Sequence, residues 1–162
     1  MDPSLAKTLK TTRGLAYRYY YSPAKDSKPT IFFAHGFPST ADSWHKQASF
    51  FQTHGYGVVV PDLLGYGGTD KPTDVDVYRL KLVVGDLMEI FDHEKLDKIV
   101  AIGHDWCVHP LSKFFKETQT MISIQGVHFS FKTRQLPSDR QSHHRVRIFR
   151  NLLLPSRRKL RY

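Results

Sequence analysis

Residues 99–107 read IVAIGHDWC, a short apolar run followed by a turn that carries one carboxylate between small residues. A strand that ends in small-x-Asp-x-small is typical of a nucleophile elbow, the sharp strand-to-helix turn that lifts one side chain above a parallel sheet. The lifted residue here is Asp105. A carboxylate in this position attacks carbon and forms an alkyl ester, which water must later cleave. The stretch therefore predicts a parallel α/β sheet and a candidate nucleophile.

A carboxylate directly after a strand is also common as a helix N-cap, and Gly-x-Asp alone would favour that interpretation. The complete pentapeptide favours the elbow, because the crowded turn requires small residues such as Gly103 and Cys107 on either side of Asp105.

Apolar runs upstream predict the rest of the sheet. Residues 30–34 and 57–60 are rich in β-branched or aromatic side chains, as expected of strands that are buried on both faces. The aromatic stretch 15–21 predicts one or two antiparallel strands that open the sheet. Residues 121–127 are a weaker candidate for a further strand.

Helical patterns lie between these runs. Trp44, Ala48 and Phe51 recur at helical spacing, and Gly55 stands where a left-handed C-terminal cap belongs. A second pattern has one apolar stripe and acidic residues that are expected to face away from it. Its apolar members are Leu80, Val83, Val84, Leu87, Met88 and Phe91, and its acidic members are Asp86, Glu89 and Asp92.

The alternation of strands and helices predicts an α/β fold with right-handed crossovers. Such sheets bind ligands at the carboxyl ends of their strands, and the motifs of this chain stand at those ends.

The positive charge is concentrated near the end of the chain. Residues 1–130 contain 14 Lys and Arg and 14 Asp and Glu, whereas residues 131–162 contain 10 basic residues and one acid. The net charge of +9 therefore belongs to one segment and does not by itself indicate a nucleic-acid enzyme. We expect residues 1–130 to form the core domain and residues 131–162 to be a poorly ordered basic tail.

The single cysteine, Cys107, excludes an internal disulfide and a thiolate zinc cluster, so no metal or cofactor is expected. Residues 1–10 have no apolar leader core, and no run approaches the roughly 20 apolar residues of a membrane helix. We expect a cytoplasmic protein.

Residues 35–38, HGFP, follow the strand at 30–34. Gly36 would let the backbone approach a ligand closely, and the amide of Phe37 would join the amide of Trp106 as a pair of donors for developing negative charge. The alternative is a plain turn in which His35 packs and Pro38 stiffens the chain.

The glycine-rich segment 62–72, DLLGYGGTDKP, has neither the Gly-Lys-Ser/Thr ending of a P-loop nor the third glycine of a dinucleotide fingerprint. We expect it to form tight turns that bring Asp62 against the neighbouring loops.

Four ordered motifs resemble the epoxide hydrolases of the α/β-hydrolase fold. They are HGFP at 35–38, DLLGYGGTDKP at 62–72, YRLKLVVGDLMEIFD at 78–92 and GHDW at 103–106. The resemblance extends over about residues 15–128 and is specific over 31–106.

This resemblance implies that Asp105 opens an epoxide as the nucleophile and that the Phe37 and Trp106 amides hold the oxyanion when the ester is hydrolysed. It also implies a small-molecule epoxide as substrate and a cis peptide bond before Pro38. The residues expected to line the substrate site are His35, Gly36, Pro38 and Trp106.

Haloalkane dehalogenases share the Asp and the following Trp, but they usually have Asn in place of Phe37 to hold halide, so the epoxide interpretation is favoured. Fluoroacetate dehalogenases can also have HGFP, but their elbow is similar to GHDR, whereas this chain has Trp106 at the last position. A serine esterase is disfavoured because position 105 is Asp.

Departures from the family begin at Cys107, where glycine is usual, and continue at Pro110 early in the expected helix. No resemblance is visible after Phe131. No residue matches the catalytic His, the third acid or the lid tyrosines. We therefore expect a truncated hydrolase with an unrelated or frame-shifted tail and little or no turnover.

A different interpretation is a non-catalytic binding protein whose basic tail engages anionic lipid or nucleic acid. Val146, Phe149, Leu152 and Leu153 could form an apolar face flanked by arginines, as in a membrane-surface helix. A disordered, solvated tail is the simpler alternative.

Overall fold

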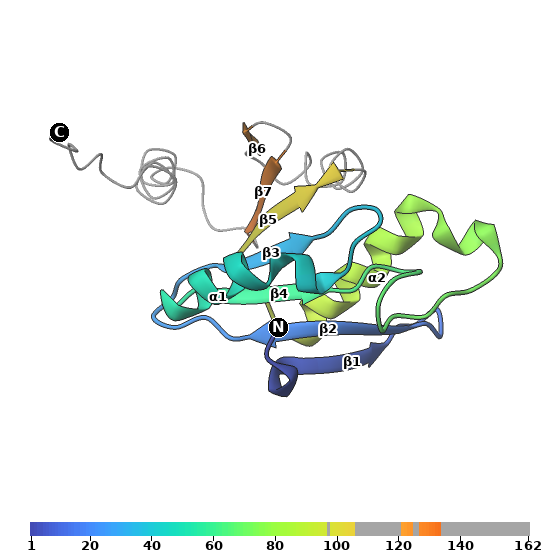
Figure 1. Ribbon diagram of the computed structural model, residues 1–162, viewed down its shortest axis with the longest axis horizontal. Helices are drawn as coiled ribbons and strands as arrows, with labels where there is room; N and C mark the ends of the chain where they lie inside the picture. The colour runs from blue at the N-terminus through green and yellow to red at the C-terminus, as the bar shows by residue number, and fades with distance from the viewer. Residues whose placement is uncertain (97, 106–120, 125–126, 134–162) are drawn as a thin grey trace, which may run out of the picture.

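The computed structural model describes residues 1–96, 98–105, 121–124 and 127–133 (Figure 1). In these residues one mixed sheet has the strand order β1-β2-β4-β3-β5-β7-β6. The strands are β1 (Ala6–Lys10), β2 (Ala16–Ser22), β3 (Thr30–Ala34), β4 (Gly57–Pro61), β5 (Lys98–His104), β6 (Met121–Ile124) and β7 (Val127–Thr133). The helices are α1 (His45–Thr53) and α2 (Leu80–His93), with short 3-10 turns η1 (Pro3–Leu5), η2 (Ala41–Trp44) and η3 (Val75–Tyr78). None of the described helices has the length and apolar composition to cross a membrane.

The centre of the sheet is parallel, as the sequence predicted. β3 pairs in parallel with β4 on one side and with β5 on the other. The chain reaches β4 through α1 and reaches β5 through α2, so the two crossovers run in opposite directions along the sheet. Right-handed crossovers in opposite directions put their helices on opposite faces, and Figure 1 shows α1 in front of the sheet and α2 behind it.

Each face of the central strands has its own core, because successive side chains of a strand point to opposite faces. Phe32 packs edge-on against Phe91 of α2, with ring centroids 5.0 Å apart. Its neighbour Phe33 packs against Trp44 on the α1 side, at 5.1 Å. All four rings are buried. The continuous apolar runs in the sequence therefore reflect burial on both faces.

The first predicted helix, with Gly55 as its cap, is confirmed by α1 and by the positive φ of Gly55 at 81°. The prediction for α2 was wrong in two places. Leu80 is 45% exposed at the start of the helix and does not belong to the core, and Asp86, expected to face away from the apolar stripe, is completely buried. The reason for the second error is a tertiary partner: Arg13 and Tyr17 contact the Asp86 carboxylate at 2.6 and 2.8 Å.

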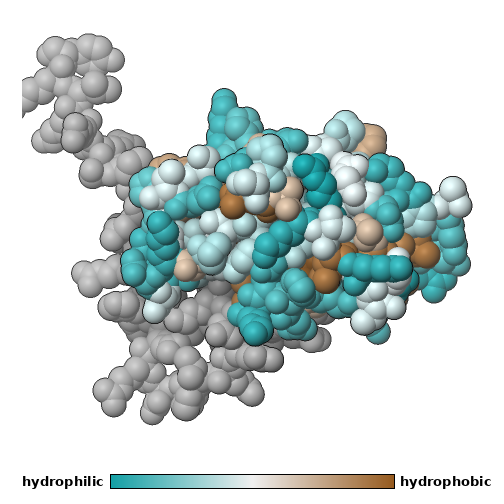
Figure 2. All heavy atoms as spheres, turned by 90° about the horizontal axis from the view of Figure 1, so that it is seen from below, coloured by the Kyte–Doolittle hydropathy of each residue, from teal (hydrophilic) through white to brown (hydrophobic). Residues whose placement is uncertain are grey.

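The strand β1 was not predicted. It pairs antiparallel with β2 along its whole length, but its sequence AKTLK has few of the β-branched and aromatic residues that mark strands. Lys7, Thr8 and Lys10 are exposed, and lysines on an edge strand discourage pairing with other chains. Figure 2 views the molecule from below, the side on which Figure 1 places β1, and shows a largely hydrophilic surface with small apolar groups.

The weak strand prediction at 121–127 corresponds to two strands. Only two residues separate β6 from β7, far fewer than the dozen or so that a parallel crossover requires, and the two strands pair antiparallel. β7 also pairs antiparallel with β5, with Lys98 opposite Thr133. The parallel arrangement expected for most of the sheet therefore holds for its three central strands.

β7 extends three residues into the expected tail, and the remaining part of that tail, 134–162, lies outside the described residues.

Candidate functional site

The loops that follow β3 and β5 meet at one end of the sheet. The two strands are parallel neighbours in the sheet, so their carboxyl ends lie side by side. Residues 35–38 follow β3 directly, and Asp105 follows β5 directly. The fold therefore brings together two motifs that are 68 residues apart in the sequence.

Asp105 is exposed and has a left-handed backbone with φ of 62°. A non-glycine residue in this conformation is uncommon and holds conformational strain, which collects at functional sites. This backbone conformation directly after β5 is compatible with the predicted elbow, which stays a prediction. Trp106 and Cys107, which complete the predicted elbow, lie outside the described residues.

The main contact of the site joins Phe37 to Asp105. The Phe37 amide donates a hydrogen bond of 3.0 Å to Asp105 Oδ2. Among the described residues, this is the one hydrogen bond given for the Asp105 carboxylate, and it engages Oδ2. The Phe37 side chain is 68% exposed. The peptide bond between Phe37 and Pro38 is cis, as the resemblance implied.

The predicted substrate-lining residues occupy different depths. Gly36 is buried and Pro38 is exposed beside Phe37. Trp106, the other predicted lining residue and second amide donor, is outside the described residues. The roles of all these residues in substrate binding stay predictions.

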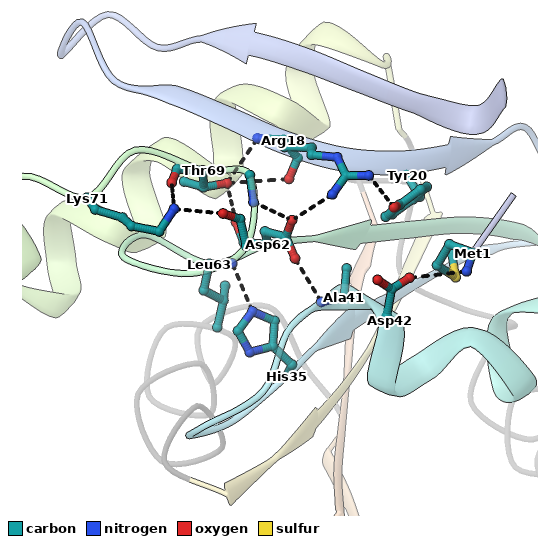
Figure 3. Close-up of polar contacts among 12 residues, drawn as sticks. Met1, Arg18, Tyr20, His35, Ala41, Asp42, Asp62, Leu63, Thr69 and Lys71 are labelled. Atoms are coloured by element: carbon teal, nitrogen blue, oxygen red, sulfur yellow. Dashed lines mark hydrogen bonds and ion pairs between the residues drawn. The ribbon is translucent and has the colours of Figure 1, made fainter. Parts of the chain in front are cut away.

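The side chain of His35, the first residue after β3, is buried, with 1% of its surface exposed. Its Nε2 accepts a hydrogen bond of 3.0 Å from the Leu63 amide (Figure 3). Its Nδ1 lies 3.0 Å from the Gly36 carbonyl oxygen. The edge of its ring also contacts Tyr66, with centroids 5.2 Å apart. Burial lowers the pKa of His35 and outweighs the opposing effects of the Gly36 carbonyl and the Asp62 charge. His35 is buried and packed, as the alternative interpretation of a plain turn expected. Its hydrogen bond with the Leu63 amide was not predicted.

Asp62 connects the loops that surround the site. It is 2% exposed and accepts hydrogen bonds from the amides of Ala41, at 2.8 Å, and Gly68, at 2.9 Å. The Arg18 guanidinium of β2 lies 3.5 Å from its Oδ2 (Figure 3). Gly67 has a φ of 49°, and a Cβ there would lie 2.2 Å from the Asp62 carboxyl carbon. The glycines therefore allow close approach to Asp62, and the structural role predicted for this loop is confirmed.

The buried His35 predicts a pH-dependent stability. Because its pKa is lowered in the folded state from 6.5, the unfolded chain binds a proton first as the pH falls. The free energy of unfolding should therefore decrease below about pH 6.5, by at most about 1.4 kcal/mol per pH unit for this one group. Urea unfolding of the wild type and of His35→Asn between pH 5 and 8 gives the free energy of unfolding of each protein. Subtracting one from the other at each pH removes the contribution of the other histidines, which both proteins share. Equal slopes for the two proteins would contradict the prediction.

In the described part of the chain, no three His, Cys, Asp or Glu side chains gather as a metal ion would require. The chemistry that these residues offer is that of a carboxylate held by a backbone amide.

Comparison with known proteins finds similar sequences for part of the chain. Residues 29–106 match the model of the alpha/beta hydrolase fold family. The chain is 40% identical over 80 residues to epoxide hydrolase 2 of Siraitia grosvenorii, covering 49% of this chain and 25% of the relative. It is 38% identical over 107 residues to epoxide hydrolase 4 of Mus musculus, covering 65% of this chain and 30% of the relative.

Solved structures agree with these relatives. An epoxide hydrolase A from Mycobacterium thermoresistibile superposes with a TM-score of 0.61 at 31% identity, over 68% of this chain and 34% of that one. A Vigna radiata epoxide hydrolase variant gives a TM-score of 0.63 at 28% identity, over 69% of this chain and 34% of that one. The chain thus spans about a quarter to a third of the length of these proteins.

Proposed function

We propose that this chain, whose residues 29–106 match the alpha/beta hydrolase fold family, is a member of that family and opens epoxides with Asp105 as the nucleophile. In this reaction Oδ1 of Asp105 forms a bond to one carbon of the oxirane ring. The bond from that carbon to the ring oxygen breaks, and the oxygen keeps the electron pair and takes a proton from water or from an acid outside the described residues. The product is an ester between Asp105 and the hydroxyalkyl group.

The observation that carries the proposal is the hydrogen bond from the Phe37 amide to Asp105 Oδ2. This bond holds one carboxylate oxygen in place and leaves Oδ1 as the oxygen proposed to attack, which supports attack in a defined direction. When water attacks the ester, the carbonyl oxygen gains negative charge, and an amide donor placed at that oxygen stabilises it. The same backbone group therefore serves both steps.

The second step also needs a base that activates water. The sequence analysis matched no residue to the catalytic His that would be this base. We therefore still predict little or no turnover, because the ester should form faster than it is cleaved.

The apolar Phe37 side chain bears on the choice between an epoxide and a haloalkane. It is exposed beside the nucleophile and has no donor for a leaving halide ion. An epoxide keeps its leaving oxygen attached to the product and releases no halide. This difference favours the epoxide, and the expected cytoplasmic location and tail partners remain predictions.

Incubation of the 162-residue chain with excess styrene oxide is the direct test. Intact mass spectrometry should show one adduct with the mass of the whole epoxide, and peptide mapping should place it on Asp105. Little diol should appear in the solution. Absence of an adduct together with absence of diol would contradict the proposal.

A parallel incubation with a primary alkyl bromide distinguishes the haloalkane alternative. Faster alkylation of Asp105 by the bromide than by the epoxide, with release of bromide, would favour dehalogenase chemistry instead.

A further inference from the structure

The amide of Phe37 and the carbonyl of Gly36 belong to one planar peptide group. Because that group is rigid and trans, the carbonyl and the N–H point in opposite directions. The Gly36 oxygen accepts a hydrogen bond of 2.9 Å from the Ser39 amide and lies 3.0 Å from His35 Nδ1. The Phe37 N–H, on the opposite side, points to Asp105 Oδ2 at 3.0 Å. Whatever fixes the carbonyl therefore also aims the amide.

The contacts of His35 with Gly36 and Leu63 indicate which ring nitrogen carries the proton. The Gly36 carbonyl can only accept, so Nδ1 must donate to it. The Leu63 N–H can only donate, so Nε2 must be unprotonated. The ring is therefore a neutral Nδ1–H tautomer that joins two loops from opposite sides.

We propose that His35 is a positioning residue whose Nδ1–H holds the Gly36–Phe37 peptide in the plane that directs the Phe37 amide at the Asp105 carboxylate. The inference deepens the proposed function and rests on it, since the aimed amide is the donor of that reaction. His35 does not touch the nucleophile, and it acts through the backbone.

The surroundings of His35 make this assignment specific. The Leu63 amide follows Asp62, which accepts hydrogen bonds from the Ala41 and Gly68 amides, so Nε2 of the ring is bonded to a loop that is itself held by these contacts (Figure 3). The ring is 1% exposed and packs against Tyr66. Its donor side therefore has a fixed position from which to hold the Gly36 oxygen.

Two variants separate the two halves of the ring. In His35→Asn the side-chain amide nitrogen can reach the position of Nδ1 and donate to Gly36, but the bond to Leu63 is lost. In His35→Gln the side-chain oxygen can reach the position of Nε2 and accept from Leu63, but the donor to Gly36 is lost. Each variant loses one of the hydrogen bonds to Gly36 and Leu63 in the same buried place, so each controls for the loss of stability in the other.

The proposal predicts that Asp105 is alkylated by styrene oxide at least about tenfold faster in His35→Asn than in His35→Gln, since misplacing the group that orients a nucleophile has effects of this size or larger. The difference should lie in the maximal rate of adduct formation and not in the half-saturating epoxide concentration. Equal rates in the two variants, or a faster His35→Gln, would overturn the proposal.

A second readout does not depend on activity. In ¹H–¹⁵N spectra, the Phe37 amide resonance should stay close to its wild-type position in His35→Asn and move in His35→Gln. The imidazole of the wild type should show a proton on Nδ1 only. If wild-type protein forms no adduct, the proposed function fails, but this measurement still decides the role of His35: an unmoved Phe37 resonance in His35→Gln overturns it.

Discussion

Asp105→Asn is expected to lower the rate of adduct formation with styrene oxide by a factor on the order of 10⁴ or more, which is the scale of loss when a covalent nucleophile is removed. A neutral amide oxygen is a far weaker nucleophile than a carboxylate. Asn is also one of the residues that best tolerate a left-handed backbone, and its oxygen can still accept from Phe37. The variant should therefore keep the fold while it loses the reaction. Intact mass measured over time gives the rate.

Asp26→Asn is the matched control for this experiment. Asp26 is also an exposed aspartate with a positive φ, of 50°, but it lies in the connection between β2 and β3. The same chemical change on the same kind of backbone should leave adduct formation unaltered. Undiminished alkylation of the Asp105→Asn protein would show that another residue reacts and would exclude Asp105 as the nucleophile.

Asp86→Ala should produce the largest loss of stability. The carboxylate is fully buried between α2 and the start of the sheet, 2.6 Å from Arg13 Nη1 and 2.8 Å from the Tyr17 hydroxyl. Burial raises the pKa of Asp86 and outweighs the opposing effects of Tyr17 and Arg13. Removing the carboxylate leaves both partners without it, and breaking a buried pair in this way typically destabilises a protein by about 3 to 5 kcal/mol. Because Arg13 is partly exposed, we expect the lower end of that range.

Urea unfolding followed by circular dichroism measures this change, and Asp76→Ala provides the comparison. Asp76 pairs with Arg79 at 2.9 Å, but both side chains are about 70% exposed, and exposed pairs of this kind contribute at most about 1 kcal/mol. An equal decrease in the free energy of unfolding in both variants would contradict the prediction that the buried Asp86 pair contributes more to stability than the exposed Asp76 pair.

Much of the fold could be predicted because the relevant signals are local. The strands β3, β4 and β5 are marked by continuous apolar runs, and α1 by apolar spacing and its glycine cap. The strand β1 could not be predicted, since its residues have little strand preference and depend on pairing with β2. The direction of β7 depends on its pairing with β5, which no periodicity records.

For the site, the sequence by itself predicted two groups: a carboxylate after one strand as the nucleophile and a backbone amide after another as a hydrogen-bond donor. Those identities follow from residue type and spacing, which the chain carries without folding. Only the tertiary structure decided that Phe37 N–H meets Asp105 Oδ2, that His35 is buried against Leu63, and that Asp86 faces inward to Arg13. The physical reason is that hydrogen bonds and burial between distant segments depend on positions in space, which the order of crossovers around β3 sets.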